Sequence, residues 1–517
     1  MALTPLLLQW CQELNKSISI TSFLFSTLLL LLLISLNFFK GNKKLNLPPS
    51  PPRLPIIGHI HLLGTLPYKS LRTLSQTYGH LLLIYLGSAP TLVVSSAEMA
   101  KEIMRTQDIT FSNRFQTKAS KIILYGCHDV AFSPHGEYWR QIKKICVTQL
   151  LCINRVHSFH SHREKEVMGL IAKIRCACLD SAPINLGELF VHLSSNIISR
   201  CALGRKYEGE ENIKRFGELS RSAMIQLGEF CFQDIFPSLW WMDVLTGFVK
   251  RLEDTYEGLD AFFEKIIEAH RCSKENYHQP DKNCFIEILL QLQNEGNMGM
   301  DMTHDSIKAI LLDMFIGGTD TTSATMEWAM TELMKNPTMM KKSQEEIRRV
   351  VGKKSRVDQD NIDQMDYLKC VVKETLRLHP PGPVLIPREL TASVKLGDYD
   401  IPPKTRVLIN AWAIQRDPNL WDRPEEFLPD RFAKNPLDFK GQDFQFIPFG
   451  AGRRGCPGIS FSVVEVEYVL ANLLFWFDWK LPVGVKDLDM SDSFGLAVRK
   501  KVLLKLVPVL HSAESLK

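Results

Sequence analysis

The chain has 517 residues and 45% of them are hydrophobic, so it is long enough to bury a large core. Its 62 basic and 57 acidic residues leave a formal net charge of only +5, which argues against nucleic acid or another polyanion as a partner. The twelve cysteines are scattered, without a Cys-x-x-Cys spacing suited to tetrahedral zinc or a redox pair. A body that faces a reducing, cytosolic environment is expected.

The N-terminal region contains a long apolar segment. No charged residue occurs between Lys16 and Lys40, and at about 1.5 Å per residue a helix of that length crosses a hydrocarbon core of about 30 Å. A cleaved signal peptide would have a shorter apolar region that ends in small residues, whereas this one ends in phenylalanine and lysine. We therefore expect a transmembrane anchor over residues 18–39, with residues 1–17 in the lumen and the body in the cytosol.

Residues 40–58 are basic at first and then rich in proline. Proline fixes φ and disfavours a helix at the residue before it, so this segment is predicted to be a semi-rigid hinge. Beyond it we find no repeat, low-complexity tract or second linker. Residues 59–517 are therefore expected to form a single domain.

Strand patterns come first in this domain and helical patterns dominate later. Residues 81–86 and 91–95 favour short strands. Residues 305–335 and 367–378 favour helices, each of which stops just before a proline, and residues 459–477 favour a last long apolar helix. These patterns predict a mainly α fold with a minor β lobe.

Residues 448–458 form a glycine-rich loop around Cys456, directly before the last predicted helix. Its glycines allow a tight turn and a close approach to a bulky planar group. Backbone N–H groups near a helix start, together with the cation of Arg454, favour a thiolate.

The same loop also matches the Gly-x-Gly-x-x-Gly fingerprint of dinucleotide-binding proteins, and Asp478 follows at a suitable distance. Against this alternative, two bulky arginines fill the loop and Pro457 interrupts the expected helix start. The short remainder of the chain after Asp478 is also too small for the second half of such a fold. The thiolate interpretation is therefore favoured.

The pattern Phe449-x-x-Gly452-x-Arg454-x-Cys456-x-Gly458 resembles the haem-binding signature of the cytochrome P450 family. The resemblance extends from the anchor to the C-terminus, and is to the plant microsomal branch that serves specialised metabolism. It implies the P450 fold and haem b, with the Cys456 thiolate as axial ligand and with Phe449 and Arg454 beside the cofactor. Without this context a free cysteine is most often core filler.

Gly317 and Gly318 lie inside the long predicted helix, where each glycine costs about 1 kcal/mol relative to alanine. The resemblance implies that this helix passes over the haem, with Asp320 as a proton-delivering acid and Thr321 as the neighbouring hydroxyl. The segment alone is also consistent with threonine hydroxyls that simply bond the preceding turn.

Two further groups of residues follow from the resemblance. Glu374, Arg377 and Arg431 are expected to form a charge network that fixes the cysteine loop, although Glu374 and Arg377 alone would be an ordinary helix-surface pair. The residues expected to reach the haem propionates are Trp139, Lys143 and Arg388, in addition to Arg454. Lys143 stands where the family usually has arginine and so lacks the bidentate fork. A solvated basic face around Lys143 is an equally open interpretation.

The resemblance also implies the function. Electrons would come from NADPH-cytochrome P450 reductase, and the chain would be a single-pass protein of the endoplasmic reticulum membrane. It would use O2 to hydroxylate a lipophilic plant metabolite, a terpenoid or an alkaloid, with a phenolic or flavonoid as the alternative. Isomerases and dehydratases of the same fold work without a reductase but typically lack the acid and threonine, so Asp320 and Thr321 argue against that class. A non-catalytic haem binder would not need the pair either.

By resemblance, the substrate pocket would be lined by the distal helix and by four other segments. These are largely apolar, as small-molecule pockets generally are. They are residues 112–130, 236–240, 384–386 and 494–496.

Overall fold

The computed structural model describes residues 22, 24–29, 45–204, 210–273, 284–296, 301–354 and 356–511. The chain divides into two compact units, one made of Met1–Leu47 with Gly397–Asp400 and the other of Pro48–Leu396 with Ile401–Lys517. In the first unit, residue 22 and residues 24–29 are helical and largely exposed. The rest of the predicted anchor, residues 1–17 and residues 40–44 of the predicted hinge lie outside the described residues.

Helices dominate the larger unit. Its longer helices are α2 (Pro67–Tyr78), α5 (Glu137–Ile145), α7 (His160–Leu179), α8 (Leu186–Leu203), α9 (Glu210–Gly228), α12 (Phe248–Ser273), α13 (Phe285–Glu295), α14 (His304–Lys335), α15 (Pro337–Val351), α17 (Asp366–Leu378) and α20 (Ile459–Trp476). Shorter helices are α3 (Ala97–Lys101), α4 (Lys118–Ile123), α6 (Ile153–Ser158), α10 (Phe232–Ile235), α11 (Trp240–Leu245), α16 (Gln359–Ile362), α18 (Ala411–Ile414) and α19 (Asp430–Ala433). Single turns of 3-10 or π helix are η1 (Ile60–Leu62), η2 (Glu102–Thr106), η3 (Cys146–Leu150), η4 (Pro237–Leu239) and η5 (Gly452–Arg454).

The sheets are small. The main one has the strand order β1-β2-β8-β5-β3, with β1 (Leu81–Leu86), β2 (Ala89–Val94), β3 (Asn113–Arg114), β5 (Arg388–Glu389) and β8 (Arg406–Ile409). β1 and β2 form an antiparallel hairpin in which Leu81 pairs with Val94. A second sheet has the order β4-β12-β9, made of β4 (Ile184–Asn185), β12 (Lys505–Leu510) and β9 (Phe477–Lys480). The remaining strands are β6 (Val394–Leu396), β7 (Tyr399–Ile401) and the pair β10 (Asp492–Ser493) and β11 (Arg499–Lys500).

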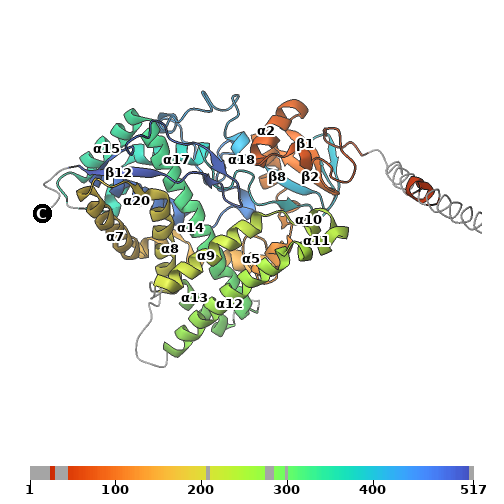
Figure 1. Cartoon of the computed structure of the whole chain (residues 1–517), viewed down its shortest axis with the longest axis horizontal. Helices are drawn as coiled ribbons and strands as arrows, with labels where there is room; N and C mark the ends of the chain where they lie inside the picture. The colour runs from red at the N-terminus through yellow and green to blue at the C-terminus, as the bar shows by residue number, and fades with distance from the viewer. Residues whose placement is uncertain are drawn as a thin grey trace, which may run out of the picture. The chain divides into compact units, whose positions relative to one another are not determined.

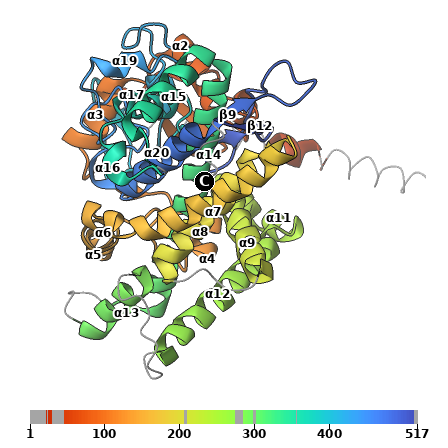
Figure 2. The same cartoon turned by 90° about the vertical axis from the view of Figure 1, so that its left-hand side faces the viewer.

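Helix α14 runs through the middle of the larger unit (Figure 1; Figure 2 shows the same arrangement from the side). It packs against α8, α20, α17, α9 and α13. The Thr303 side chain accepts the Ser306 N–H at 3.2 Å and so caps its start. It ends at Lys335 because Pro337 begins α15 at a first-turn position, where proline's missing N–H is tolerated.

The predicted elements are confirmed with small shifts at their ends. The predicted strand 81–86 is β1, the second strand starts earlier than residue 91, and the last long helix ends at Trp476 because Phe477 already belongs to β9. Among the described residues, α20 alone is long and apolar enough to cross a membrane, but 72% of it is buried inside the protein, as in a core helix. The mainly α fold with a minor β part is confirmed.

Candidate active site

The cysteine loop is held by its own backbone. The Cys456 N–H donates to the Phe449 carbonyl at 3.0 Å, and the Gly458 N–H donates to the Cys456 sulfur at 3.3 Å. This places the sulfur next to the start of α20, where free N–H groups favour negative charge. The Phe449 ring lies edge-on to Phe439 with ring centroids 5.7 Å apart, so it packs on the adjoining core.

The loop lies so close to η2 that only glycine fits at position 452. Gly452 has φ +67°, and a Cβ there would lie 2.0 Å from the Met104 carbonyl oxygen. In the same contact, Asp108 Oδ2 accepts the Arg453 N–H at 2.8 Å. Asp108 therefore anchors the loop, a role that our sequence reasoning missed because no local motif marks it.

The surroundings of the Cys456 thiol act on its charge in opposite directions. Burial raises its pKa, whereas the Gly458 N–H and the cation of Lys143 lower it. The residue nevertheless has exposed surface. The Lys143 ammonium group donates a hydrogen bond to the Gly455 carbonyl, which fixes it beside the loop.

Three buried arginines, Arg114, Arg388 and Arg454, gather beside this loop. Burial lowers the pKa of each, and neighbouring arginines lower the pKa of Arg114 and Arg454 further. Arg454 donates to the carbonyls of Ser112 at 2.7 Å and Ser133 at 2.6 Å. The result is a concentration of buried positive charge, which is costly unless anions or hydrogen-bond acceptors compensate it.

The predicted propionate residues lie within or next to this cluster. The Arg454 guanidinium lies 4.0 Å from the centre of the Trp139 ring, whose N–H donates to the Val130 carbonyl at 3.1 Å. Arg388 donates to Asp108 Oδ1 at 3.2 Å and to the Ala451 carbonyl at 3.3 Å, so it ties β5 to the cysteine loop. Sequence reasoning did not single out Arg114.

The distal segment of α14 has an open face. Gly317 is exposed, and a Cβ built there meets no atom of the described chain within 4 Å, whereas a Cβ at Gly318 would touch Ile198 at 3.4 Å. The Thr321 hydroxyl donates to the Gly317 carbonyl at 2.5 Å. The hydroxyl thus bonds the preceding turn, as the alternative interpretation expects, and does so at the exposed Gly317.

Asp320 is buried and paired with a cation from another element. Arg499, on β11, donates to Asp320 Oδ2 at 2.6 Å. Burial raises the pKa of Asp320, while Arg499 and Arg221 lower it. The acid is therefore paired with Arg499, a partner that no sequence pattern indicated.

The expected charge network is assembled around Glu374, which is fully buried with Arg377. Arg377 donates to both carboxylate oxygens of Glu374, at 2.7 and 2.8 Å. Arg431 donates a further hydrogen bond to Glu374 at 3.0 Å, and the Leu428 N–H donates another at 2.8 Å. Every charge in this group is thus matched by several hydrogen bonds.

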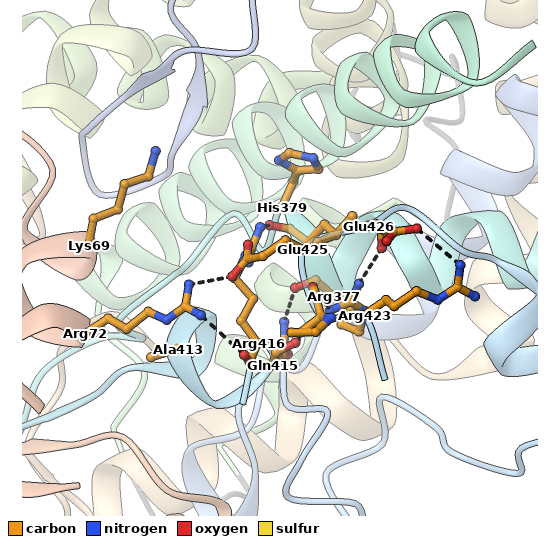
Figure 3. A network of polar contacts seen from close by, with 12 residues as sticks. Lys69, Arg72, Arg377, His379, Ala413, Gln415, Arg416, Arg423, Glu425 and Glu426 are labelled. Carbon is orange, nitrogen blue, oxygen red and sulfur yellow. Dashed lines mark hydrogen bonds and ion pairs between the residues drawn. The ribbon is translucent and has the colours of Figure 1, made fainter. Parts of the chain in front are cut away.

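Gln415 connects this network to the segment before the cysteine loop. Its amide group donates to the carbonyls of Leu376 and Arg377, and its oxygen accepts the Ile447 N–H at 3.0 Å. Figure 3 shows Gln415 beside Arg377 and Arg416. The network therefore reaches the cysteine loop through a neutral side chain that sequence reasoning missed.

The segments expected to line the substrate pocket do not share one environment. Val130 is buried, and Val384 packs on the small core formed by β1, β2 and α2. Trp240 is 57% exposed, and Phe494 stacks on Tyr68 with ring centroids 6.4 Å apart.

Known proteins of similar sequence and fold identify the family of this chain. The sequence model described as Cytochrome P450 matches residues 48–506. The chain is 52% identical to phenylacetaldehyde oxime monooxygenase CYP71AN24 of Prunus mume, covering 91% of this chain and 90% of that protein. It is 51% identical to cytochrome P450 71A1 of Persea americana, with 88% and 91% covered. A zebra fish cytochrome P450 solved with progesterone has a TM-score of 0.75 at 23% identity, covering 86% of this chain and 99% of that chain.

The chain therefore belongs to the cytochrome P450 family. It is a plant cytochrome P450 monooxygenase, similar to enzymes of specialised metabolism, and its cofactor is haem with a cysteine thiolate ligand.

The described residues fit this cofactor. Haem is flat, carries two propionates and needs a thiolate. The site offers a sulfur that accepts a backbone N–H, the exposed glycine face of α14, and three buried guanidinium groups whose mutual repulsion two carboxylates would relieve.

Asp108 gives the first testable prediction. Asp108→Ala removes the acceptor of the Arg453 N–H and the partner of Arg388, so we expect a loss of about 1–3 kcal/mol in the stability of the loop and faster loss of haem. Haem transfer to an acceptor protein measures this rate. Glu98→Ala, an exposed carboxylate on the neighbouring α3, is the control and should leave the rate unchanged. Equal rates for wild type and Asp108→Ala would contradict the assigned role.

Proposed function

We propose that Cys456 is the axial ligand and that Trp139, Lys143, Arg388 and Arg454 hold the propionate side of the haem. The observation that carries this proposal is the convergence of buried cations on the loop of Cys456, whose sulfur accepts a backbone N–H next to the start of α20. Phe449 supports the loop through its carbonyl oxygen and its ring.

The haem, when bound, supplies O2 activation, with the thiolate favouring O–O cleavage. In our proposal the protein's own residues deliver protons. Asp320 takes up a proton near Arg499 and passes it toward the exposed Gly317 face, where the Gly317 carbonyl holds the Thr321 hydroxyl in position to relay it. The raised pKa of Asp320 suits an acid that must bind and release protons.

Electrons would come from NADPH through cytochrome P450 reductase. The alternative is a reductase-independent isomerase or dehydratase of the same fold. Two observations favour the monooxygenase with a reductase: Asp320 and Thr321 are both present at the distal helix, and the relative from Prunus mume is named a monooxygenase.

The proposed substrate is a lipophilic plant metabolite that the enzyme hydroxylates, a terpenoid or an alkaloid, with a phenolic or flavonoid as the alternative. The apolar character of most segments proposed to line the pocket supports a lipophilic substrate. A panel of these four classes, tested for substrate-induced spectral shifts, separates them. A response only to polar, charged compounds would contradict the proposal.

Asp320 and Thr321 provide the test of the reaction. In enzyme reconstituted with reductase, Asp320→Asn is expected to lower product formation by about 10²-fold, and Thr321→Ala to divert electrons into hydrogen peroxide. Product, NADPH and peroxide are measured together. The matched control is Thr331→Ala, because the Thr331 hydroxyl also bonds a carbonyl four residues back on α14 but lies beyond the open face. Full coupling in both site variants would refute the proton-delivery role.

The proposed location is the endoplasmic reticulum membrane, with residues 18–39 as a single-pass anchor, residues 1–17 in the lumen, a hinge at residues 40–58 and a cytosolic catalytic domain over residues 59–517. Deleting residues 1–44 is expected to reduce membrane retention strongly while preserving the haem spectrum. Protease protection of an N-terminal tag in sealed microsomes reports the orientation. Unchanged retention, or digestion of the tag, would contradict the respective part of this proposal.

A further inference from the structure

A short loop before α5, residues 128–133, is held from two sides. On one side its carbonyl oxygens accept hydrogen bonds from two arginines of the cation cluster and from Trp139. Arg454 and Trp139 donate to Val130, and Arg114 donates to Ala131 at 2.9 Å. On the other side its N–H groups donate to carboxylates. The loop thus links the cation cluster to α14 through these carboxylates.

One of these carboxylates belongs to Asp313 and the other to Asp129, which is part of the loop itself. Asp313, on α14, accepts the Val130 N–H at 2.6 Å and the Ala131 N–H at 3.3 Å. Asp129 accepts the Phe132 N–H at 2.7 Å. Because Val130 directly follows Asp129, the two carboxyl groups lie against the same turn of the chain.

The pair carries more negative charge than its surroundings satisfy. Asp129 is fully buried, and its Oδ1 has no hydrogen-bond partner in the described part of the chain. Burial raises the pKa of Asp129 to about 6, and burial together with the Asp129 charge raises the pKa of Asp313 well above its ordinary value. Two such neighbouring carboxyls titrate as a unit.

We propose that Asp129 and Asp313 share one proton, and that this pair positions the 128–133 loop on α14 and thereby the cofactor-facing side chains of Trp139 and Arg454. We assign the shared proton to Asp129 Oδ1, which has no hydrogen-bond partner in the described part of the chain, with Asp313 as the second carboxyl. The proposal rests on the proposed function in one respect: it takes the haem to be the group that Trp139 and Arg454 contact.

The other groups that act on the pair do not replace this proton. Arg454 and Arg114 interact with Asp129, but their guanidinium groups already donate to carbonyls of the same loop. Tyr138, Cys127 and Cys146 also interact electrostatically with the pair. Burial raises the pKa values of these three groups to about 12, 11 and 12. These three groups therefore stay neutral while the carboxyls titrate.

The sign of the pH dependence follows from the raised pKa values. The folded protein holds a proton that the unfolded chain, with carboxyl pKa values of about 4, releases. Stability contributed by the pair is therefore fully present below about pH 4, decreases as the pH rises, and becomes constant once the pH exceeds the raised pKa of Asp313.

Asparagine and alanine at position 313 separate a shared proton from mere packing. In Asp313→Asn the amide oxygen accepts the two loop N–H groups and the amide N–H donates to Asp129, so it mimics the protonated partner. Asp313→Ala provides neither. Asp305→Asn, an exposed carboxylate at the start of the same helix, is the control. Each haem-loaded protein is examined by infrared spectroscopy for the carbonyl band of a protonated carboxyl group, by unfolding across pH, and by haem dissociation.

We expect Asp313→Asn to lose one protonated-carboxyl band and part of the pH dependence of unfolding while keeping its haem. Asp313→Ala should release haem about tenfold faster, as the loss of satisfied buried hydrogen bonds implies. Asp305→Asn should match wild type. The proposal would be overturned if Asp313→Asn kept every protonated-carboxyl band of the wild type, or if it lost haem as fast as Asp313→Ala. The infrared band and the unfolding profile are read independently of thiolate ligation, so a failure of the proposed function is distinguishable from a failure of this inference.

Discussion

Cys456→Ser is expected to abolish monooxygenase activity, with turnover falling to background. Serine keeps the size of the side chain, and the hydrogen bond from the Cys456 N–H to the Phe449 carbonyl belongs to the backbone, so the loop should keep its shape. A hydroxyl at this position does not ionise as a thiol does and cannot supply a thiolate. Haem content and product formation are measured on the same preparation.

The control for this variant is Cys176→Ser, since Cys176 is an exposed cysteine on α7 and lies outside the site. It should retain wild-type turnover and haem content. Wild-type turnover in Cys456→Ser would show that another residue binds the iron.

Glu374→Gln is expected to be the most destabilising of the structural variants. Glu374 is fully buried, and its two oxygens accept hydrogen bonds from Arg377, Arg431 and the Leu428 N–H. Removing its charge leaves the buried guanidinium of Arg377 without a counter-charge, which costs about 3–5 kcal/mol when a buried pair is broken. Because Gln415 connects Arg377 to Ile447, haem retention should fail together with stability.

Denaturant unfolding of the haem-loaded protein measures this loss. The matched control is Glu426→Gln in the same region, whose carboxylate pairs with Arg423 (Figure 3). Both of these side chains are more than half exposed, at 56% for Glu426 and 57% for Arg423. A surface pair of this kind contributes about 0–1 kcal/mol. If the two variants unfold at the same denaturant concentration, the buried network is not what stabilises the loop.

Much of the fold follows from local sequence patterns. Prolines mark the ends of α14 and α17, and the aliphatic run that forms β1 is a local feature as well. Such signals act over a few residues, which is why they are readable in one sequence.

The site is harder to predict, because its contacts join distant parts of the chain. Asp108 meets Arg453, and Asp320 meets Arg499, across separations that no local motif reports. The cysteine loop itself was recognisable because its glycines and Cys456 are close in sequence. Gln415 is neutral and matches no charge pattern, so only the fold reveals it.

The central claim is that Cys456 provides the thiolate that holds the haem iron. The most direct test is the absorption spectrum of the reduced, carbon-monoxide-bound protein, recorded for wild type and Cys456→Ser. We predict the red-shifted Soret band of a thiolate-ligated haem in wild type and its absence in the variant. A wild type that folds without haem, or a variant that keeps the band, would contradict the account.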